Sequence, residues 1–300
     1  MNVKKVVSRI ALSFLIALGA AQTAFAGLQI ELVYIENPPQ PGAPVVTGGG
    51  QLREIMKVAA ENWERVFKHA SGNWKLTVEY GWGNLHGQFY GKEFAISERG
   101  NNPPHIGHSC VLFNADATLD DPVKGFFADP TPSDNSEYLA YTADTINTDY
   151  GWLNVARTFS EPTGEAVNRV DMLMLAMHEL GHALGLDADY SGLKKQWRGF
   201  GQFTITRPRP FAGFEYFLVN GPHIGDLPTP LMIADIPSGE RRIIPAADAL
   251  LLAQINLVDR PDLSEPPLDF NGDGRTIPTR SVSSSFSCPP GGPPRPTGVW

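Results

Sequence analysis

The sequence predicts a fold in which helices and strands are mixed. The chain has 300 residues, of which 42% are hydrophobic and 19% are charged, so it can bury a sizeable core in one large domain or two small ones. Apolar residues recur at helical spacing over Gln51–Lys68. Runs rich in β-branched and aromatic residues, such as Leu28–Ile35 and Trp74–Trp82, are typical of strands instead.

The first 26 residues have the pattern of an export signal. Lys4, Lys5 and Arg9 make a positive segment, the apolar run Ile10–Ala21 follows, and Ala24–Ala26 offers the small-x-small cleavage pattern. The apolar run is shorter than the roughly 20 residues that span a bilayer, so we expect cleavage after residue 26 and no stable membrane insertion. The mature protein is expected to be secreted, either to the exterior or into the periplasm.

The first half of the mature chain is predicted to be rich in strands. In order, we expect a strand at Leu28–Ile35, a loop at Asn37–Gly50, a helix at Gln51–Lys68, and strands at Trp74–Trp82, Gln88–Ile96 and Ser109–Asn114. Asp129–Asp149 is polar and turn-rich, which predicts irregular structure.

The second half contains two predicted helices separated by an insertion. Met172–Gly185 is a strongly apolar helix, and Pro245–Leu257 is a helix with Pro245 at its first position. Between them, Ser191–Gly221 has short strand-like pieces at Phe203–Thr206 and Phe214–Val219. From Asp259 onward, proline, serine and glycine dominate, so residues 261–300 are expected to form a tail.

A metal-binding pattern lies inside the apolar helix. Residues 178–182 are His-Glu-Leu-Gly-His, and residues four apart on a helix share one face, so His178 and His182 can present two imidazoles to one ion. Glu179 lies one position round the helix, where its carboxylate can reach a metal-bound water. Core histidines satisfied by hydrogen bonds are the alternative. Two histidines and a glutamate in so apolar a segment would be costly without a partner, which favours zinc.

Gly185 strengthens this interpretation, because a glycine there can take a positive φ, end the helix and turn the chain back below the metal. The segment His178–Asp187, HELGHALGLD, strongly resembles the active-site helix of metzincins, and of matrixins in particular. The resemblance is specific over Met172–Asp187 and loose over Leu28–Leu257. It implies an α+β fold for residues 27–260: a twisted mixed sheet with an active-site helix, a C-terminal Met-turn and a closing helix.

The third metal ligand departs from the family pattern. In the family's long motif it lies six residues after the second histidine, but here that position is Ala188, which cannot ligate. Asp187 and Asp189 flank the place, each out of register by one residue. Glu215 suits a thermolysin-like pattern but lies 33 residues beyond the second histidine. His223 is a lone histidine on a turn-rich segment, and these four candidates stay open on the residues alone.

The resemblance selects His223 among them. In leishmanolysin-like and some bacterial secreted relatives, an insertion separates the glycine from the third histidine, which then falls shortly before the Met-turn. Met232, in Pro230-Leu231-Met232, matches that turn and is expected to form part of a hydrophobic floor beneath the ligands. The resemblance thus implies a zinc site of His178, His182 and His223 with Met232 below it.

The implied function is a secreted zinc endopeptidase that acts as a monomer on a protein or peptide substrate, with Glu179 as the general base on the zinc-bound water. The net charge of −8 and the lack of a basic run after the first ten residues argue against nucleic acid as a partner. Two alternatives remain. One is a catalytically inactive, adhesin-like zinc-binding surface protein on the same fold, which Ala188 favours. The other is a surface protein without metal, in which the motif is incidental.

Calcium is possible at two places. Asp269, Asn271 and Asp273 match the first half of an EF-hand-like loop, but position 12 is Arg280, where a carboxylate should stand. The competing interpretation is a turn in a disordered tail. Loop acids before the zinc helix could also hold structural calcium, as loops in matrixins do: Asp116, Asp120, Asp121 and Asp129.

The remaining histidines and cysteines give weaker signals. His105 and His108, with Cys110 nearby, could bind a second metal, but a solvent-exposed loop is the expectation because no matching half-site exists. Cys110 and Cys288 could form one disulfide in an oxidising compartment, or remain as two thiols.

Overall fold

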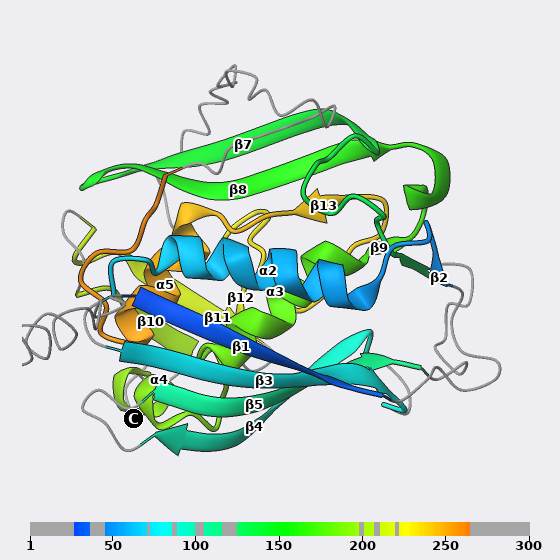
Figure 1. Cartoon of the computed structure of the whole chain (residues 1–300). Helices are drawn as coiled ribbons and strands as arrows, with labels where there is room; N and C mark the ends of the chain where they lie inside the picture. Colours follow the sequence, from blue (N-terminus) through cyan, green and yellow to red (C-terminus); the bar gives the residue numbers. More distant parts are fainter. Residues whose placement is uncertain are drawn as a thin grey trace, which may run out of the picture.

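The computed structural model describes residues 27–36, 46–70, 73–85, 89–99, 105–115, 125–197, 201–206, 211–219 and 222–264. Its fold is of mixed α+β type, as expected (Figure 1). The signal-like segment, the calcium-like loop with Asp269, Asn271 and Asp273, Cys288, and Asp116, Asp120 and Asp121 lie outside the described residues. Within the described ranges, no helix is long and apolar enough to cross a membrane.

The largest sheet has four strands in the order β1-β3-β5-β4: β1 (Gly27–Ile35), β3 (Asn73–Gly83), β5 (His105–Asn114) and β4 (Gly91–Arg99). Strands β1, β3 and β5 are parallel, and β4 runs antiparallel to β5. All four strands overlap predicted strands, although β5 begins four residues earlier than expected, and the sheet is mixed, as expected. Strand β4 is one of its two edge strands.

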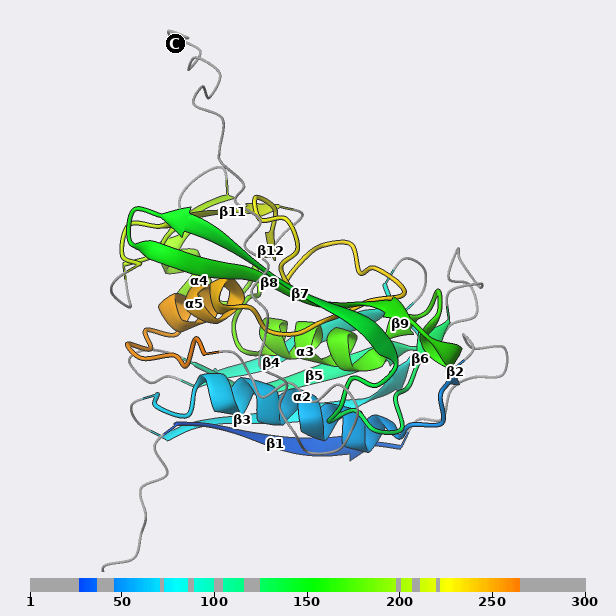
Figure 2. The same cartoon turned by 90° about the horizontal axis from the view of Figure 1, so that it is seen from above.

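Helices α2 (Leu52–Val66) and α3 (Met172–Ala183) pack against each other on one side of this sheet (Figure 2). The indole Nε1 of Trp63 on α2 donates to the carbonyl oxygen of Met177 on α3 at 2.9 Å. Both helices follow the predicted apolar periodicity, and α3 buries nearly all of its residues because it packs against α2, strands β4 and β5, and the short strands β9 (Val170–Asp171) and β13 (Arg241–Arg242). The segment with the metal motif therefore runs through the middle of the protein.

A long hairpin lies on the other side of these helices (Figure 1). It consists of β7 (Tyr138–Thr148) and β8 (Gly151–Pro162), with β13 (Arg241–Arg242) paired to β8. The expectation of irregular structure at Asp129–Asp149 is therefore wrong over most of its length. Strand β7 is an edge strand with many partly exposed polar side chains, but its tyrosine, threonine and isoleucine residues favour a strand, and it pairs with β8 along its length.

The start of α3 is held in place by a buried ion pair. Strands β2 (Val46–Thr47), β6 (Phe126–Phe127) and β9 (Val170–Asp171) form a small parallel sheet that leads directly into α3. Asp171 caps the helix by accepting from the backbone N–H of Met174 at 2.7 Å. The fully buried guanidinium of Arg241 contacts Asp171 at 2.8 Å and also binds Asp129. Asp129 thus has a protein cation as its partner, which does not support its assignment as a calcium ligand.

Between α3 and the C-terminal helix, the chain forms α4 (Ser191–Gln196) and an antiparallel sheet of β10 (Gln202–Thr204), β11 (Glu215–Val219) and β12 (His223–Ile224). The strand-like pieces predicted in this insertion are confirmed in outline. The final helix is α5 (Ala246–Ile255), and Pro245 caps it rather than occupying its first turn. A short 3-10 turn, η1 (Gly164–Ala166), follows β8.

The expectation that His105 and His108 lie in an exposed loop is wrong, because both belong to β5. Side chains alternate along a strand, so residues three apart point to opposite faces. The His105 ring stacks on Trp74 with 4.8 Å between ring centroids, whereas His108 Nε2 lies 3.1 Å from Glu79 Oε1. The two histidines therefore cannot share a metal. Cys110 forms no disulfide within the described residues.

Candidate metal centre

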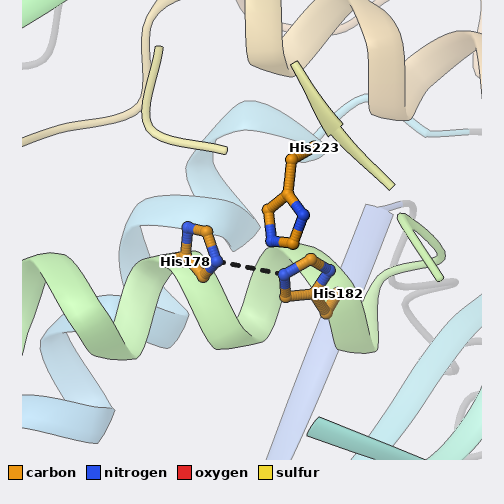
Figure 3. Close-up of side chains that lie close together, drawn as sticks. All are labelled: His178, His182 and His223. Carbon is orange, nitrogen blue, oxygen red and sulfur yellow. Dashed lines mark hydrogen bonds between the residues drawn. The ribbon is translucent and has the colours of Figure 1, made fainter. Parts of the chain in front are cut away.

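Helix α3 presents His178 and His182 one turn apart on the same face, as their spacing predicts (Figure 3). Their Nε2 atoms are 3.0 Å apart. The helix ends where expected, since Gly185 has a φ of +116°. The backbone N–H of Leu186 donates to the carbonyl of Gly181 at 3.2 Å, which folds the chain back beneath the second histidine.

His223 completes a group of three. It lies on β12, where it pairs with Val219 of β11, and its ring projects toward the two helix histidines (Figure 3). Its ring centroid is 5.5 Å from that of His178 and 5.0 Å from that of His182. Each histidine offers one nitrogen within 4.8 Å of the other two, and within the described part of the chain no other group of three or more potential ligands is this close.

The Nδ1 atoms of the two helix histidines, which point away from the centre of the site, are hydrogen-bonded to backbone carbonyls. His178 Nδ1 donates to the Leu231 carbonyl at 2.9 Å, and His182 Nδ1 donates to the Leu186 carbonyl at 2.6 Å. A carbonyl oxygen only accepts, so both protons lie on Nδ1 and both Nε2 atoms carry lone pairs toward the centre of the site.

Burial keeps these imidazoles neutral. Burial, together with the neighbouring histidines, lowers the pKa of His178 well below its ordinary value and that of His182 to about 4. Two lone pairs that face each other at 3.0 Å repel unless a cation lies between them. Neutral imidazoles with outer hydrogen-bond partners are the usual ligands of zinc and similar divalent metals, so the donor set fits such an ion.

Glu179 lies beside the histidines at the wall of a cavity of about 450 Å³. The cavity is also lined by Gly91–Glu93 of β4 and by residues 234–236 after the Met232 segment. The Glu179 side chain is 5% exposed, and its carboxylate accepts a hydrogen bond from the backbone N–H of Glu93. Burial, reinforced by the carboxylate of Glu93, raises the pKa of Glu179 to about 8. A nearby divalent cation would lower it again by favouring the charged form.

Comparison of the chain with protein-family models, with curated proteins and with solved structures finds no match. The chemistry of the site therefore rests on its own residues.

Met232 packs against α3 at Gly181, which lies between the two helix histidines. It is fully buried, and it lies so close to Gly181 that a side chain there would collide with its sulfur. Its carbonyl accepts from the backbone N–H of Ile224, the residue after His223, at 2.7 Å. Its own N–H donates to Asp248 on α5 at 2.7 Å. The turn is thus tied to both the third histidine and the last helix.

The other proposed third ligands do not join the three histidines. Asp187 lines the cavity, but one of its carboxylate oxygens accepts from the backbone N–H of Asp189 at 2.9 Å, and it is outside the close group. Asp189 pairs with Lys194 at 2.9 Å. Glu215 is exposed on β11, where it accepts from Gln202 at 2.8 Å.

Four residues that contribute to the site are not among the predicted site residues. The carbonyls of Leu186 and Leu231 leave no trace in a side-chain pattern, because any residue has a carbonyl. Asp248 is favourable in a first helical turn on sequence grounds, but its role in holding the Met232 segment depends on tertiary packing. Gly91 had a weak signal, since an isolated glycine in a strand often marks a close approach of another group.

Proposed function

We propose that this protein is a secreted zinc-dependent endopeptidase of the metzincin type. One observation carries the proposal: three histidines each bring a ring nitrogen into one close group, and a buried glutamate lies beside them in the same cavity. Three protein ligands leave one position of a tetrahedral zinc ion open for water, which is the pattern of catalytic rather than structural zinc sites.

Zinc, when bound, brings the pKa of its water ligand to about 7 and polarises a substrate carbonyl. The residues of the chain supply the proton transfers. Glu179 takes a proton from the attacking water and returns it to the leaving amine. A purely structural metal site has no use for such a carboxylate, because it would only add the cost of burying a charge.

Strand β4 supports a peptide as the substrate. It is one of the two edge strands of the four-stranded sheet, pairs only with β5 among the described strands, and borders the cavity next to Glu179. Edge strands offer backbone donors and acceptors that an extended peptide can use as an additional strand. An endopeptidase must bind peptide residues on both sides of the scissile bond, and an exposed strand edge allows the substrate to extend in both directions.

The test is Glu179→Gln, which keeps the shape of the side chain but cannot accept the proton. We expect unchanged zinc content and a loss of about 10²–10⁴-fold in kcat, the usual contribution of a general base. His178→Ala is the matched comparison and should lose both zinc and activity. Zinc content is measured by elemental analysis, and cleavage by mass spectrometry of a peptide library.

Other outcomes select the alternatives. A Gln variant that cleaves at the wild-type rate would exclude this mechanism. Stoichiometric zinc without any peptide cleavage by the wild type would favour an inactive zinc-binding surface protein, and a purified protein without zinc would favour an incidental motif.

A further inference from the structure

Gly91 of β4 lies directly against the side chain of Glu179. A Cβ atom at position 91 would lie 2.7 Å from Glu179 Oε1, 3.0 Å from its Cγ and 3.1 Å from its Cδ. These are the three nearest heavy atoms, so the closest obstacle to a side chain at position 91 is the Glu179 side chain. Gly91 is not among the residues with a positive φ, so the glycine is required by this close approach and not by backbone strain.

A second contact comes from the same strand two residues later, where the backbone N–H of Glu93 donates to the Glu179 carboxylate. Strand β4 therefore contacts the Glu179 side chain twice, with the bare Cα of Gly91 and with the backbone N–H of Glu93. The ladder to β5 holds this stretch in register, with Gly91 opposite Phe113 and Glu93 opposite Val111. The Glu93 side chain also accepts from the hydroxyl of Ser109 on β5.

We infer that Gly91 is a positioning residue: its missing side chain lets the backbone of β4 close against Glu179 and hold the carboxylate in its place beside the histidines. The inference rests on the proposed function for its catalytic consequence, but the contact itself can be tested without activity. The histidines are held from the other side, by the carbonyls of Leu186 and Leu231, so a change at Gly91 should move Glu179 and leave the metal ligands in place.

The first experiment is a double-mutant cycle read by thermal unfolding of the full chain. Gly91→Ala should lower Tm by about 3–10 °C, the range expected when a methyl group is forced into a packed site of a domain this large. The same change in a Glu179→Ala background should cost much less, because the three atoms nearest to the new Cβ have been removed. Gly91→Ala that folds only in the Glu179→Ala background would be the extreme form of the same result.

Gly83→Ala is the matched control, since it also places a methyl group in this sheet but meets the Leu112 side chain at 2.8 Å. Its effect on Tm should be the same with or without Glu179. An equal cost of Gly91→Ala in both backgrounds would overturn the inference.

The second experiment measures peptide cleavage by the zinc-loaded protein. Gly91→Ala should lower kcat at least tenfold, with KM within twofold and zinc content unchanged, whereas Gly83→Ala should leave kcat unchanged. A merely structural role would lower the folded fraction without this split between kcat and KM. An unchanged kcat in Gly91→Ala would overturn the positioning role. A wild type that cleaves no peptide would overturn the proposed function and with it the catalytic role, and the stability cycle would still report whether the contact exists.

Discussion

The three histidines reach the site under different constraints. His178 and His182 are brought together by helical spacing alone, and each is then oriented by a backbone carbonyl. His223 depends on the pairing of β12 with β11 and on the hydrogen bond between the Met232 carbonyl and Ile224. Asp187 is close in sequence to the helix ligands, yet it faces the cavity without joining the close group.

This difference gives a prediction for the third ligand. His223→Ala should weaken metal binding by more than the roughly 10–100-fold expected for loss of an outer hydrogen-bond partner, because it removes a ligand itself. Asp187→Ala should change the affinity far less. The measurement is competition with a metal chelator of known affinity. A larger loss in the Asp187 variant than in the His223 variant would reassign the ligand.

At the scale of elements, specific residues fix the start and the end of α3, and α5 holds the neighbouring turn at Leu231–Met232. Asp171 and Arg241 pin the start of α3, and Gly185 ends it. On α5, Asp248 accepts from the backbone N–H groups of Met232 and Leu231. The carbonyl of Leu231 in turn receives the His178 Nδ1 proton. Helix α5 is therefore linked to His178 by two successive hydrogen-bonded contacts, both through the backbone of the Leu231–Met232 turn.

Asp248 should also make stability depend on pH. Burial raises its pKa to about 7, although the backbone donors and Arg242 oppose the shift. The folded state thus holds this proton up to a higher pH than the unfolded state, in which an aspartate titrates near 3.9. The contribution of the protonated group is complete below about pH 4 and is lost as pH rises toward 7.

We therefore expect Asp248→Asn, which cannot ionise, to gain stability relative to the wild type as pH rises from 4 to 7, with a constant difference above that. Urea unfolding at a series of pH values measures it. A difference between the two proteins that stays constant from pH 4 to 8 would show that Asp248 does not titrate in this window.

At the scale of the molecule, the site joins parts that the chain keeps apart. Helices α2 and α3 lie between the four-stranded sheet and the hairpin (Figure 1). The cavity is lined by residues of β4, α3 and β12 and by the segment after Met232. A metal bound by His178, His182 and His223 would cross-link α3 to the insertion sheet. Such an ion binds the folded chain better than the unfolded chain, so its binding free energy adds to stability.

Removal of the metal should therefore lower Tm. For free metal at about a thousand times the dissociation constant, the linkage is about 4 kcal/mol, which corresponds to roughly 10 °C for a protein of this size. Calorimetry with and without a chelator measures the shift, and the His178→Ala protein should show none. An equal shift in that variant would place the stabilising ion elsewhere.

The sequence determined what depends on short spacing: the helix, its two histidines with Glu179 between them, the glycine that ends it, and most strands of the large sheet. Such features are local, because helical and strand periodicity place neighbouring side chains without reference to the rest of the chain. Tertiary structure brought His223, and none of the other three candidates, into a close group with the two helix histidines, and it set β4 against Glu179. These depend on which distant backbone segments pack together, and no local pattern encodes that.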